Sequence, residues 1–306
     1  MWPLERLDAD VVFIQQPWGM QDLPRRLARH TRVAYVHYGM PVISNDTMQF
    51  GLAQFHPWLW RYYAPTRLHA DMIQAAQGSK PPHICITGHP KFDTFLTPEP
   101  PRRDVEIWPG EATRKRVIVA PHHGLERGSL GLGTFAWSGP TLLDVARKHP
   151  EIDFLLRPHP NMALGLMRSR IMTEAQWEHY KAQWSALPNG VVQDGGSYWD
   201  VFRSSDALIT DSGSFLAEYL PTGAPLIRLE QNCAAPLNAF GQTLAEAFYK
   251  VSNSGELETV FENLIVQGND PLRNTRAKIA AQLTPFERPA AEMIIEDLRS
   301  LLKPHG

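Results

Sequence analysis

The sequence predicts an α/β protein built from two Rossmann-like lobes, each with a parallel sheet. Short apolar runs alternate with amphipathic stretches along most of the chain, which is typical of parallel α/β architecture. The alternation stops over residues 97–116, where prolines mix with charged residues, and then starts again. A length of 306 residues also fits two domains. We therefore expect two lobes that face a central cleft and are divided near residues 97–116, with no single sheet running through both.

The first lobe, assigned to residues 1–110, is expected to be short. Its sequence offers about four strands, fewer than a complete lobe of this kind usually has. Either the lobe is a reduced version, or residues upstream of Met1 would complete it. The expected strands are Val11–Gln15, Val33–His37, Leu59–Ala64 and His83–Thr87, and the expected helices are Leu23–His30 and Thr66–Gln77.

The second lobe, residues 111–306, carries a longer α/β series. Apolar runs predict strands at Val117–Ala120, Ile152–Leu156, Ala207–Thr210 and Pro225–Leu229. The expected helices are Pro140–His149, Thr173–Leu187, Ser214 to about Thr222, Glu256–Val266, Pro271–Leu283 and Pro289–Leu302. A capping box formed by Thr173 and Gln176 opens one of these helices, and Gly223 ends another. The last helix is expected to return to the first lobe.

Composition and charge argue against several classes of protein. The net charge of −2 gives no electrostatic reason to expect a nucleic-acid partner. The two cysteines, Cys85 and Cys233, lie far apart and in no metal-ligand spacing, so a reducing compartment fits best. The N-terminus lacks the pattern of a signal peptide, and no apolar run approaches the ~18 residues that span a bilayer. We expect a cytoplasmic protein, either free or bound at the inner face of the cytoplasmic membrane.

The strongest functional signal is the segment from Ala207 to Glu218, where a buried strand runs through small residues into a helix. Small residues at such a turn let an anion approach the first N–H groups of the helix, whose dipole favours negative charge. We therefore expect Ser212, Gly213 and Ser214 to bind a diphosphate, and Glu218 to accept hydrogen bonds from a ribose. The alternative is that Asp211 or Ser212 only caps the helix.

A second signal, Arg157-Pro158-His159-Pro160, follows the expected strand Ile152–Leu156. Ligands in open α/β sheets gather beyond the carboxyl ends of the strands. Arg157 could clamp a phosphate through two nitrogens, and His159 could donate to a phosphoryl oxygen. A structural pair between Arg157 and a carboxylate, beside a hydrogen-bonded loop histidine, is the alternative.

Other histidines also follow expected strands. His37 lies at a strand end in the first lobe beside Gly39 and is a candidate general base, although a lone histidine in this position is more often structural. His122, in His122-His123-Gly124, is expected to contact substrate rather than a metal, because neighbouring side chains diverge and no further ligand is evident. The glycine run at residues 128–133 is expected to be a flexible loop, and the aromatic run at residues 58–63 a half-buried strand rather than a membrane patch.

Taken in order along the chain, these motifs resemble the CDP-glycerol glycerophosphotransferase family of teichoic acid and capsule polymer synthesis. The matching segments are His37-Tyr38-Gly39-Met40-Pro41, Gly88-His89-Pro90-Lys91-Phe92-Asp93, Ala120-Pro121, Arg157-Pro158-His159-Pro160 and Ser205-Asp206-Ala207-Leu208-Ile209-Thr210-Asp211-Ser212-Gly213-Ser214. The resemblance spans about residues 33–283. Tyr38 departs from it by separating the histidine from the glycine of the first motif. Gly213 also departs from it and makes Asp211-Ser212-Gly213 similar to the nucleotide-sugar epimerases.

The resemblance implies a GT-B fold and a transferase that moves glycerol phosphate, or a related polyol phosphate, from a CDP-activated donor to a polymer or lipid-linked acceptor. His37 would deprotonate the acceptor, while Arg157, His159, Ser212 and Ser214 would stabilise the leaving phosphates. Neither a metal nor another cofactor is implied. Two further functions remain open: a nucleotide-sugar-dependent glycosyltransferase or epimerase with this fold, and a non-catalytic nucleotide-binding module.

Overall fold

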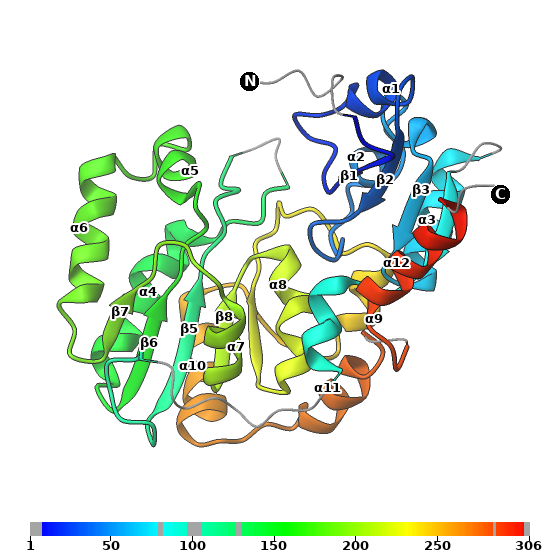
Figure 1. Ribbon diagram of the computed structural model, residues 1–306. Helices are drawn as coiled ribbons and strands as arrows, with labels where there is room; N and C mark the ends of the chain where they lie inside the picture. The colour runs from blue at the N-terminus through cyan, green and yellow to red at the C-terminus, as the bar shows by residue number, and fades with distance from the viewer. Residues whose placement is uncertain (1–7, 79–81, 97–105, 127–129, 284–285, 303–306) are drawn as a thin grey trace. The chain divides into compact units, whose positions relative to one another are not determined.

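The computed structural model describes residues 8–78, 82–96, 106–126, 130–283 and 286–302 (Figure 1). The chain forms two compact units, each with its own sheet and core. Unit 1 contains Met1–Pro98, Leu237–Gln242 and Ala281–Gly306, and unit 2 contains Glu99–Pro236 and Thr243–Ala280. Unit 2 therefore ends before the C-terminal helix, whereas the sequence assigned residues 111–306 to one lobe. The expected linker lies in part at residues 97–105, outside the described residues.

Unit 1 is built on a four-stranded parallel sheet in the order β1-β2-β3-β4. Its strands are β1 (Val11–Ile14), β2 (Arg32–Val36), β3 (Arg61–Ala64) and β4 (His83–Ile86). The helical segments around them are α1 (Leu23–Leu27), α2 (Asp46–Gln49), η2 (His56–Trp58), α3 (Arg67–Gln77), η3 (Pro90–Phe95) and α12 (Ala290–Leu301). The strands match the expected ones within two residues at each end, because each is a short apolar run bounded by polar residues. The aromatic run is mostly the buried strand β3, with Trp58 exposed in η2.

The C-terminal helix α12 packs on the sheet of unit 1. Ile294 lies in one apolar cluster with Ala34 and Val36 of β2 and with Tyr63 of β3. The Tyr63 hydroxyl donates to the Asp297 carboxylate at 2.8 Å, and Arg61 lies 3.2 Å from the same carboxylate. The two oxygens of the Asp93 carboxylate accept the N–H groups of Ala290 and Ala291, so a residue of η3 caps the start of α12. These contacts explain why α12 groups with unit 1.

Unit 2 is built on a six-stranded parallel sheet in the order β10-β9-β8-β5-β6-β7. Its strands are β5 (Lys115–Ala120), β6 (Ile152–Leu156), β7 (Gly190–Val192), β8 (Ala207–Thr210), β9 (Leu226–Leu229) and β10 (Tyr249–Val251). Successive strands run outward from β5 to β7, and the chain then crosses back to place β8 on the other side of β5. This reversal is a topological switch point, where crevices for ligands form in doubly wound sheets.

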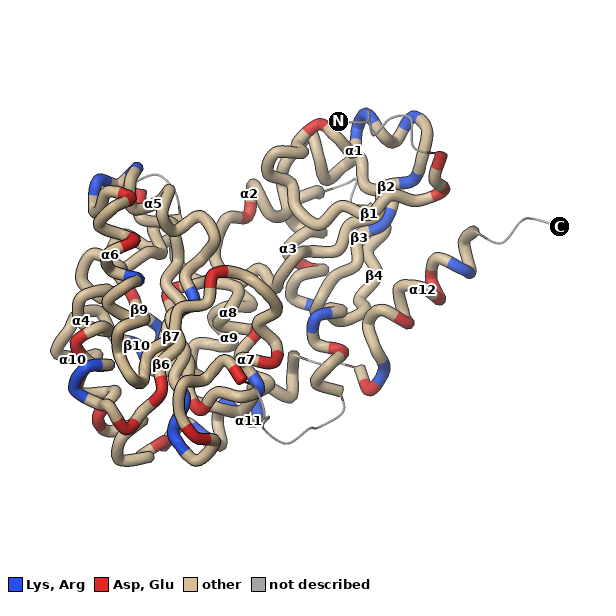
Figure 2. The backbone as a smooth tube through the Cα atoms, turned by 60° about the vertical axis from the view of Figure 1, so that its left-hand side comes forward, with Lys and Arg blue, Asp and Glu red and all other residues tan. Residues whose placement is uncertain are grey.

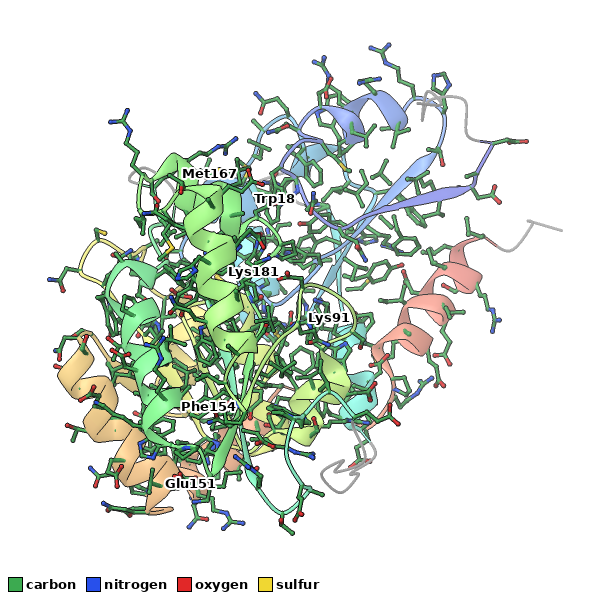
Figure 3. All side chains as sticks on the ribbon, turned by 90° about the vertical axis from the view of Figure 1, so that its left-hand side faces the viewer. Trp18, Lys91, Glu151, Phe154, Met167 and Lys181 are labelled. Carbon is green, nitrogen blue, oxygen red and sulfur yellow. The ribbon has the colours of Figure 1, made fainter. Side chains whose placement is uncertain are left out.

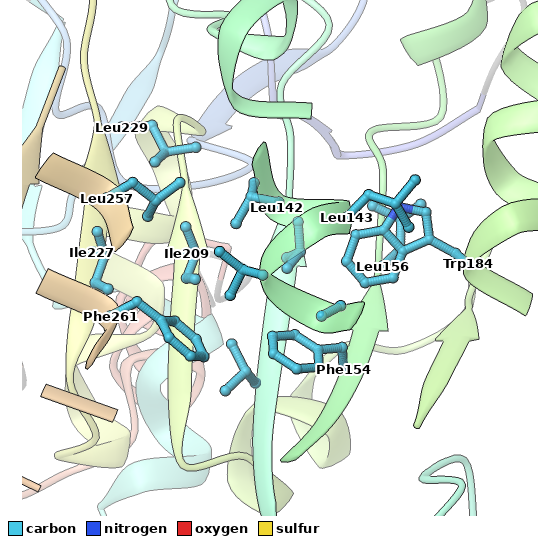
Figure 4. Close-up of a cluster of buried hydrophobic side chains, with 14 of the residues drawn as sticks. Leu142, Leu143, Phe154, Leu156, Trp184, Ile209, Ile227, Leu229, Leu257 and Phe261 are labelled. Carbon is cyan, nitrogen blue, oxygen red and sulfur yellow. The ribbon is translucent and has the colours of Figure 1, made fainter. Parts of the chain in front are cut away.

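Helices cover both faces of the unit 2 sheet (Figure 1). The helical segments are α4 (Phe135–Lys148), α5 (Met162–Arg168), α6 (Glu174–Ser185), α7 (Trp199–Ser204), α8 (Gly213–Glu218), η4 (Leu220–Thr222), α9 (Ala239–Leu244, shared with unit 1), α10 (Ser254–Phe261), η5 (Glu262–Val266) and α11 (Arg273–Ala280). The core between α4, α10 and the strands contains Leu142, Phe154, Ile209, Leu257 and Phe261 (Figure 4). Alternate residues of the central strands point to opposite faces of the sheet. Because helices cover both faces, all of β6 and β8 is buried.

Two parallel sheets in separate units confirm the predicted α/β class. The sequence missed short elements, such as β7 and α5, whose apolar runs are brief. It also placed the start of α4 too late. Pro140 lies inside this helix, which begins at Phe135, because Phe135, Leu142 and Leu143 hold its inner face in the core. Among the described helices, none combines the length and the apolar character that a membrane crossing requires.

Candidate functional site

The strand-end motifs of unit 2 meet at one edge of its sheet. The register pairs Ala120 of β5 with Thr210 of β8, and Val119 of β5 with Leu156 of β6, so the segments that follow these strands are neighbours. Hydrogen bonds join them, since the N–H of His159 donates to the Pro121 carbonyl at 3.1 Å. The motifs that contain His122, Arg157 and Ser212 therefore lie at the carboxyl ends of β5, β6 and β8, beside the switch point.

The carboxylate of Asp211 holds the loops at this edge together. Its carboxylate is 4% exposed and accepts the N–H of His122 and the N–H of Thr134, both at 2.6 Å, and the Thr134 hydroxyl at 2.9 Å. Burial raises the pKa of Asp211 to about 6, while these hydrogen bonds act in the opposite direction. The suggestion that Asp211 caps the helix is wrong, because its oxygens hold the loop after β5 and the start of α4 instead.

Ser212 occupies the N-cap position of α8, but its side chain makes no capping hydrogen bond. Its N–H donates to the Thr210 hydroxyl at 2.9 Å. Across the described residues, the hydroxyls of Ser212 and Ser214 have no hydrogen-bond partner, and both side chains are partly exposed. Gly213 between them is buried and forms the first residue of α8. The two hydroxyls are thus available as donors at the end of β8.

Arg157 is a buried cation held by neutral groups. Arg157 is 8% exposed, and its guanidinium donates to the Gln193 side chain, to the Gly195 carbonyl at 2.8 Å and to the Gly196 carbonyl at 2.5 Å. It also lies 5.7 Å from the centre of the Tyr198 ring. Within the described parts of the chain, no carboxylate contacts it, so the alternative of a structural Arg–carboxylate pair is wrong.

The guanidinium of Arg157 can accommodate an anion in addition to its present partners. Burial lowers the pKa of Arg157, because it disfavours the charged form, while Tyr198 acts in the opposite direction. The three neutral contacts use only part of the N–H donors of the guanidinium. Figure 2 shows basic and acidic residues mixed on the helices of unit 2. The positive charge of the candidate site therefore comes from one placed residue, not from a basic surface.

Three imidazoles gather in the loops that follow β5 and β6. The rings of His123 and His159 stack with their centres 3.9 Å apart, and the His122 ring lies 4.4 Å from His123. Burial, together with the other rings, lowers the pKa of His122 to about 3 and that of His159 to about 4, so both are neutral at pH 7. Among the described residues, no group of three or more His, Cys, Asp or Glu side chains is arranged to hold a metal ion.

The hydrogen bonds of His122 and His159 fix their tautomers. The Nδ1 atom of His122 accepts the N–H of Gly124, and that of His159 accepts the N–H of Asn161, each at 3.0 Å. In a neutral imidazole whose Nδ1 accepts, the proton is on Nε2. His122 and His159 can therefore each donate one hydrogen bond from Nε2 to a phosphoryl oxygen without carrying a charge.

Glu218 does not face open solvent as the expected ribose contact requires. Its side chain is 1% exposed, and its carboxylate accepts a hydrogen bond from the Tyr198 hydroxyl. Tyr198 thus joins Glu218 to Arg157, because its ring also lies against the guanidinium. In this conformation a ribose would have to replace Tyr198 as the partner of Glu218.

His37 is buried in the core of unit 1, which contradicts the expectation of an accessible general base. The side chain is 2% exposed, with Nδ1 3.2 Å from the Tyr35 hydroxyl and Nε2 hydrogen bonded to the Tyr62 hydroxyl. Burial holds the pKa of His37 well below its usual value, with smaller contributions from neighbouring histidines such as His69. With both ring nitrogens occupied, His37 cannot reach a substrate in this conformation, and we do not retain it as a base.

Sequence reasoning missed the loop that holds Arg157. Gly195 and Gly196 adopt φ values of +94° and +75°, which other residues rarely tolerate, and this turn presents their carbonyls to the guanidinium. The adjacent glycines were a usable turn signal. In the described part of the glycine run after β5, which was expected to be flexible, the Gln231 side chain donates to the carbonyls of Gly131 and Gly133.

Comparison with known proteins locates the fold. No protein-family model matches the chain, and no curated protein matches its sequence. A UDP-GlcNAc 2-epimerase from Neisseria meningitidis bound to UDP-GlcNAc is similar in structure, with a TM-score of 0.63 and 15% identity over 97% of this chain and 78% of that one. S. aureus MnaA in its UDP co-structure gives a TM-score of 0.62 and 12% identity over 96% and 76%. The fold is of the GT-B type.

A glycosyltransferase has the same GT-B arrangement. The pneumococcal O-GlcNAc transferase GtfA in complex with UDP and GlcNAc gives a TM-score of 0.53 and 14% identity over 96% of this chain and 57% of that one. At such identities, the likeness concerns the fold and not the individual residues of the site.

Proposed function

We propose that the chain is a GT-B enzyme that uses a nucleotide sugar, and that unit 2 binds the nucleoside diphosphate at the carboxyl ends of β5, β6 and β8. The observation that carries this proposal is the guanidinium of Arg157, which follows β6 beside the switch point and whose partners among the described residues are all neutral. Buried charges are normally paired. A diphosphate would supply the missing negative charge, using N–H donors that the loop leaves over.

Neutral donors around Arg157 fit the same ligand. The Nε2–H groups of His122 and His159 and the hydroxyls of Ser212 and Ser214 can each bond a phosphoryl oxygen. When the bond between a sugar and a diphosphate breaks, negative charge grows on the diphosphate. Donors that are already in position stabilise that charge more than they stabilise the bound substrate, and this lowers the barrier.

The nature of the nucleotide rests on the comparisons. The similar structures from N. meningitidis and the pneumococcus contain UDP-GlcNAc, and UDP with GlcNAc, and MnaA contains UDP. These ligands support UDP or a UDP-sugar as the first candidate for this chain. The second candidate is a CDP-activated polyol, which the ordered motifs from His37 to Ser214 support and the comparisons do not.

A binding screen tests both candidates. Thermal shift would be measured with UDP, UDP-GlcNAc, CDP and CDP-glycerol, and a ligand at 100 times its Kd stabilises by about 2.7 kcal/mol. We expect UDP and UDP-GlcNAc to stabilise the protein more than the cytidine compounds do. The reverse order would favour the polyol phosphate transferase, and no stabilisation by any of the four would refute the proposed site.

A double variant and a matched control test whether the diphosphate binds at Ser212 and Ser214. Replacing both Ser212 and Ser214 with alanine should weaken the bound nucleotide by roughly 1.5–3 kcal/mol for each lost hydrogen bond to phosphate. Ser185→Ala, at an exposed serine near the end of α6, is the matched control and should change nothing. Calorimetric affinity that is equal in the double variant and the control would show that the diphosphate binds elsewhere.

A further inference from the structure

The imidazole of His123 differs from its two neighbours in its hydrogen bonds. In His122 and in His159, Nδ1 accepts a backbone N–H, so each neutral ring carries its proton on Nε2. A second proton on either ring would go onto Nδ1 and break that hydrogen bond. Nδ1 of His123 is buried and has no hydrogen-bond partner among the described residues. His123 is therefore the ring of the three that can gain a proton without losing a hydrogen bond.

The fold holds His123 beside the other two rings. Its ring centre lies 3.9 Å from that of His159, in a stacked arrangement, and 4.4 Å from that of His122. Helix α5 approaches the backbone of His123 through Gly165, where a Cβ would collide with the carbonyl oxygen of His123. Figure 3 views this side of unit 2, with Met167 of α5 labelled. Close packing of α5 thus fixes the backbone that carries the His123 ring.

Charged groups reach His123 from the loops at this edge of the sheet. Burial lowers the pKa of His123 below its usual value, and Glu126 on the same loop acts in the opposite direction. Arg157 comes from the loop after β6, and the Asp211 carboxylate, at the end of β8, accepts the N–H of His122. The balance leaves His123 neutral at pH 7 while the site is empty.

We propose that binding of a nucleoside diphosphate charges His123, so that the bound diphosphate gains a second cation in addition to Arg157. An oxygen that is hydrogen bonded to Nε2 of His159 would lie close to the His123 ring, because the two rings stack. A negative charge at that range favours the protonated imidazole. The proton comes from solvent and stays on a ring nitrogen, and no bond of the ligand breaks. This inference rests on the proposed function and adds a dependence on pH to it.

The direction of this dependence follows from linkage. Because the complex carries a proton that the empty site lacks, the affinity should rise as the pH falls from 8 to 6. The slope of the logarithm of the affinity against pH equals the number of protons taken up. An average uptake of about half a proton would therefore make the complex about tenfold tighter at pH 6 than at pH 8.

Calorimetry with UDP-GlcNAc measures the uptake on the full chain. Each phosphate of this ligand carries a single, strongly acidic group, whereas the terminal phosphate of UDP itself titrates near pH 6. Binding enthalpies would be measured at pH 6.5 in MES and in Bis-Tris, which release a proton with different enthalpies. The difference between the two gives the number of protons, and we expect about 0.5–1 for the wild type.

Three variants assign the proton to one ring. His123→Gln cannot be protonated, so it should take up no proton and lose the difference in affinity between pH 6 and pH 8. His159→Phe keeps a ring against His123 but lacks the donor, so it should weaken binding at both pH values and keep the uptake. His179→Gln is the matched control, at an exposed histidine of α6, and should behave like the wild type. Thermal unfolding at pH 8 checks that each variant is folded.

The outcomes separate this inference from the proposed function. If the wild type binds UDP-GlcNAc without proton uptake, the inference is wrong and the proposed function stands. Uptake that survives in His123→Gln would also overturn it and would point to Asp211, whose pKa burial raises to about 6. Binding at neither pH would refute the proposed function, and this inference with it. NMR of the wild type needs no variant: the ring C–H resonances of His123 should move towards their charged positions when UDP-GlcNAc is added at pH 6.5, and unmoved resonances in the complex would contradict the inference.

Discussion

Replacing His37 with alanine should destabilise unit 1 rather than remove a catalytic base. The imidazole joins the hydroxyls of Tyr35 and Tyr62, and neither tyrosine has measurable exposure. Each buried hydroxyl left without its partner costs about 1–3 kcal/mol. The cavity left by the ring adds to this, because the aromatic side chains around it can only partly collapse. A total loss of about 3–6 kcal/mol is a large part of the stability of an ordinary domain.

Two measurements together detect this loss. Urea unfolding followed by circular dichroism gives the free energy, and hydrogen exchange of β2 and β3 shows whether the loss is located in unit 1. His30→Ala is the matched control, since His30 is an exposed histidine of the same unit and should change stability by less than about 0.5 kcal/mol. Tyr62→Phe removes one of the two partners and should cost less than His37→Ala.

One result would refute this reasoning. If His37→Ala keeps the stability and the exchange protection of the wild type but loses turnover by about 10²–10⁴-fold, the ring acts on a substrate. The buried conformation would then not be the active one, and the general base assigned from the motif would return.

Three further predictions concern polar side chains with defined partners in the structure. Burial lowers the pKa of both His69 and His89 to about 4, so the stability that their neutral forms provide is complete above pH 6.5 and is lost as the pH falls towards 4, by about 3 kcal/mol for each histidine. Circular dichroism against pH should therefore show unit 1 unfolding in acid, and an unchanged spectrum at pH 3 would contradict this. Asp211→Ala should cost about 2–4 kcal/mol in thermal unfolding, because two buried N–H groups lose their acceptor; a smaller loss than 1 kcal/mol would mean that water replaces the carboxylate. Asp93→Ala should cost about 1 kcal/mol and speed hydrogen exchange at the start of α12, and equal exchange rates would show that the cap is dispensable.

The sequence predicted the parts of the fold that local patterns determine. Ile152–Leu156 and Ala207–Thr210 were placed to the residue, because a strand that is buried on both faces is a short and mostly apolar run. The capping box at Thr173 also formed as expected, since it needs only residues of one turn. The expectation that the motifs after these strands meet at one edge of the sheet is also confirmed, because parallel strands all end on the same side. That a nucleotide binds at this edge stays a prediction.

What the sequence could not predict depends on partners far along the chain. Arg157 was expected to bind a phosphate or a carboxylate. The carbonyls of Gly195 and Gly196 that accept its hydrogen bonds lie almost forty residues along the chain, and no residue near Arg157 predicts them. The burial of His37 could partly be predicted, since it falls two and four residues after Tyr35 and Val33, which share one face of the strand and one apolar cluster. We expected this polar side chain to be accessible, because the sequence does not show that the hydroxyls of Tyr35 and Tyr62 hydrogen bond to its ring.

The position of α12 has a consequence for synthesis. The bond between Tyr63 and Asp297 spans 234 positions, so the ribosome makes the strand long before it makes the helix that covers it. At about 5–20 residues per second, the delay is roughly ten to fifty seconds. During that time α12 does not cover the apolar face formed by Ala34, Val36 and Tyr63, and Arg61 lacks the carboxylate of Asp297 as its partner. Unit 2 ends at Ala280, so all of its residues are made before α12, and the first-made strands are the last to gain their full set of contacts.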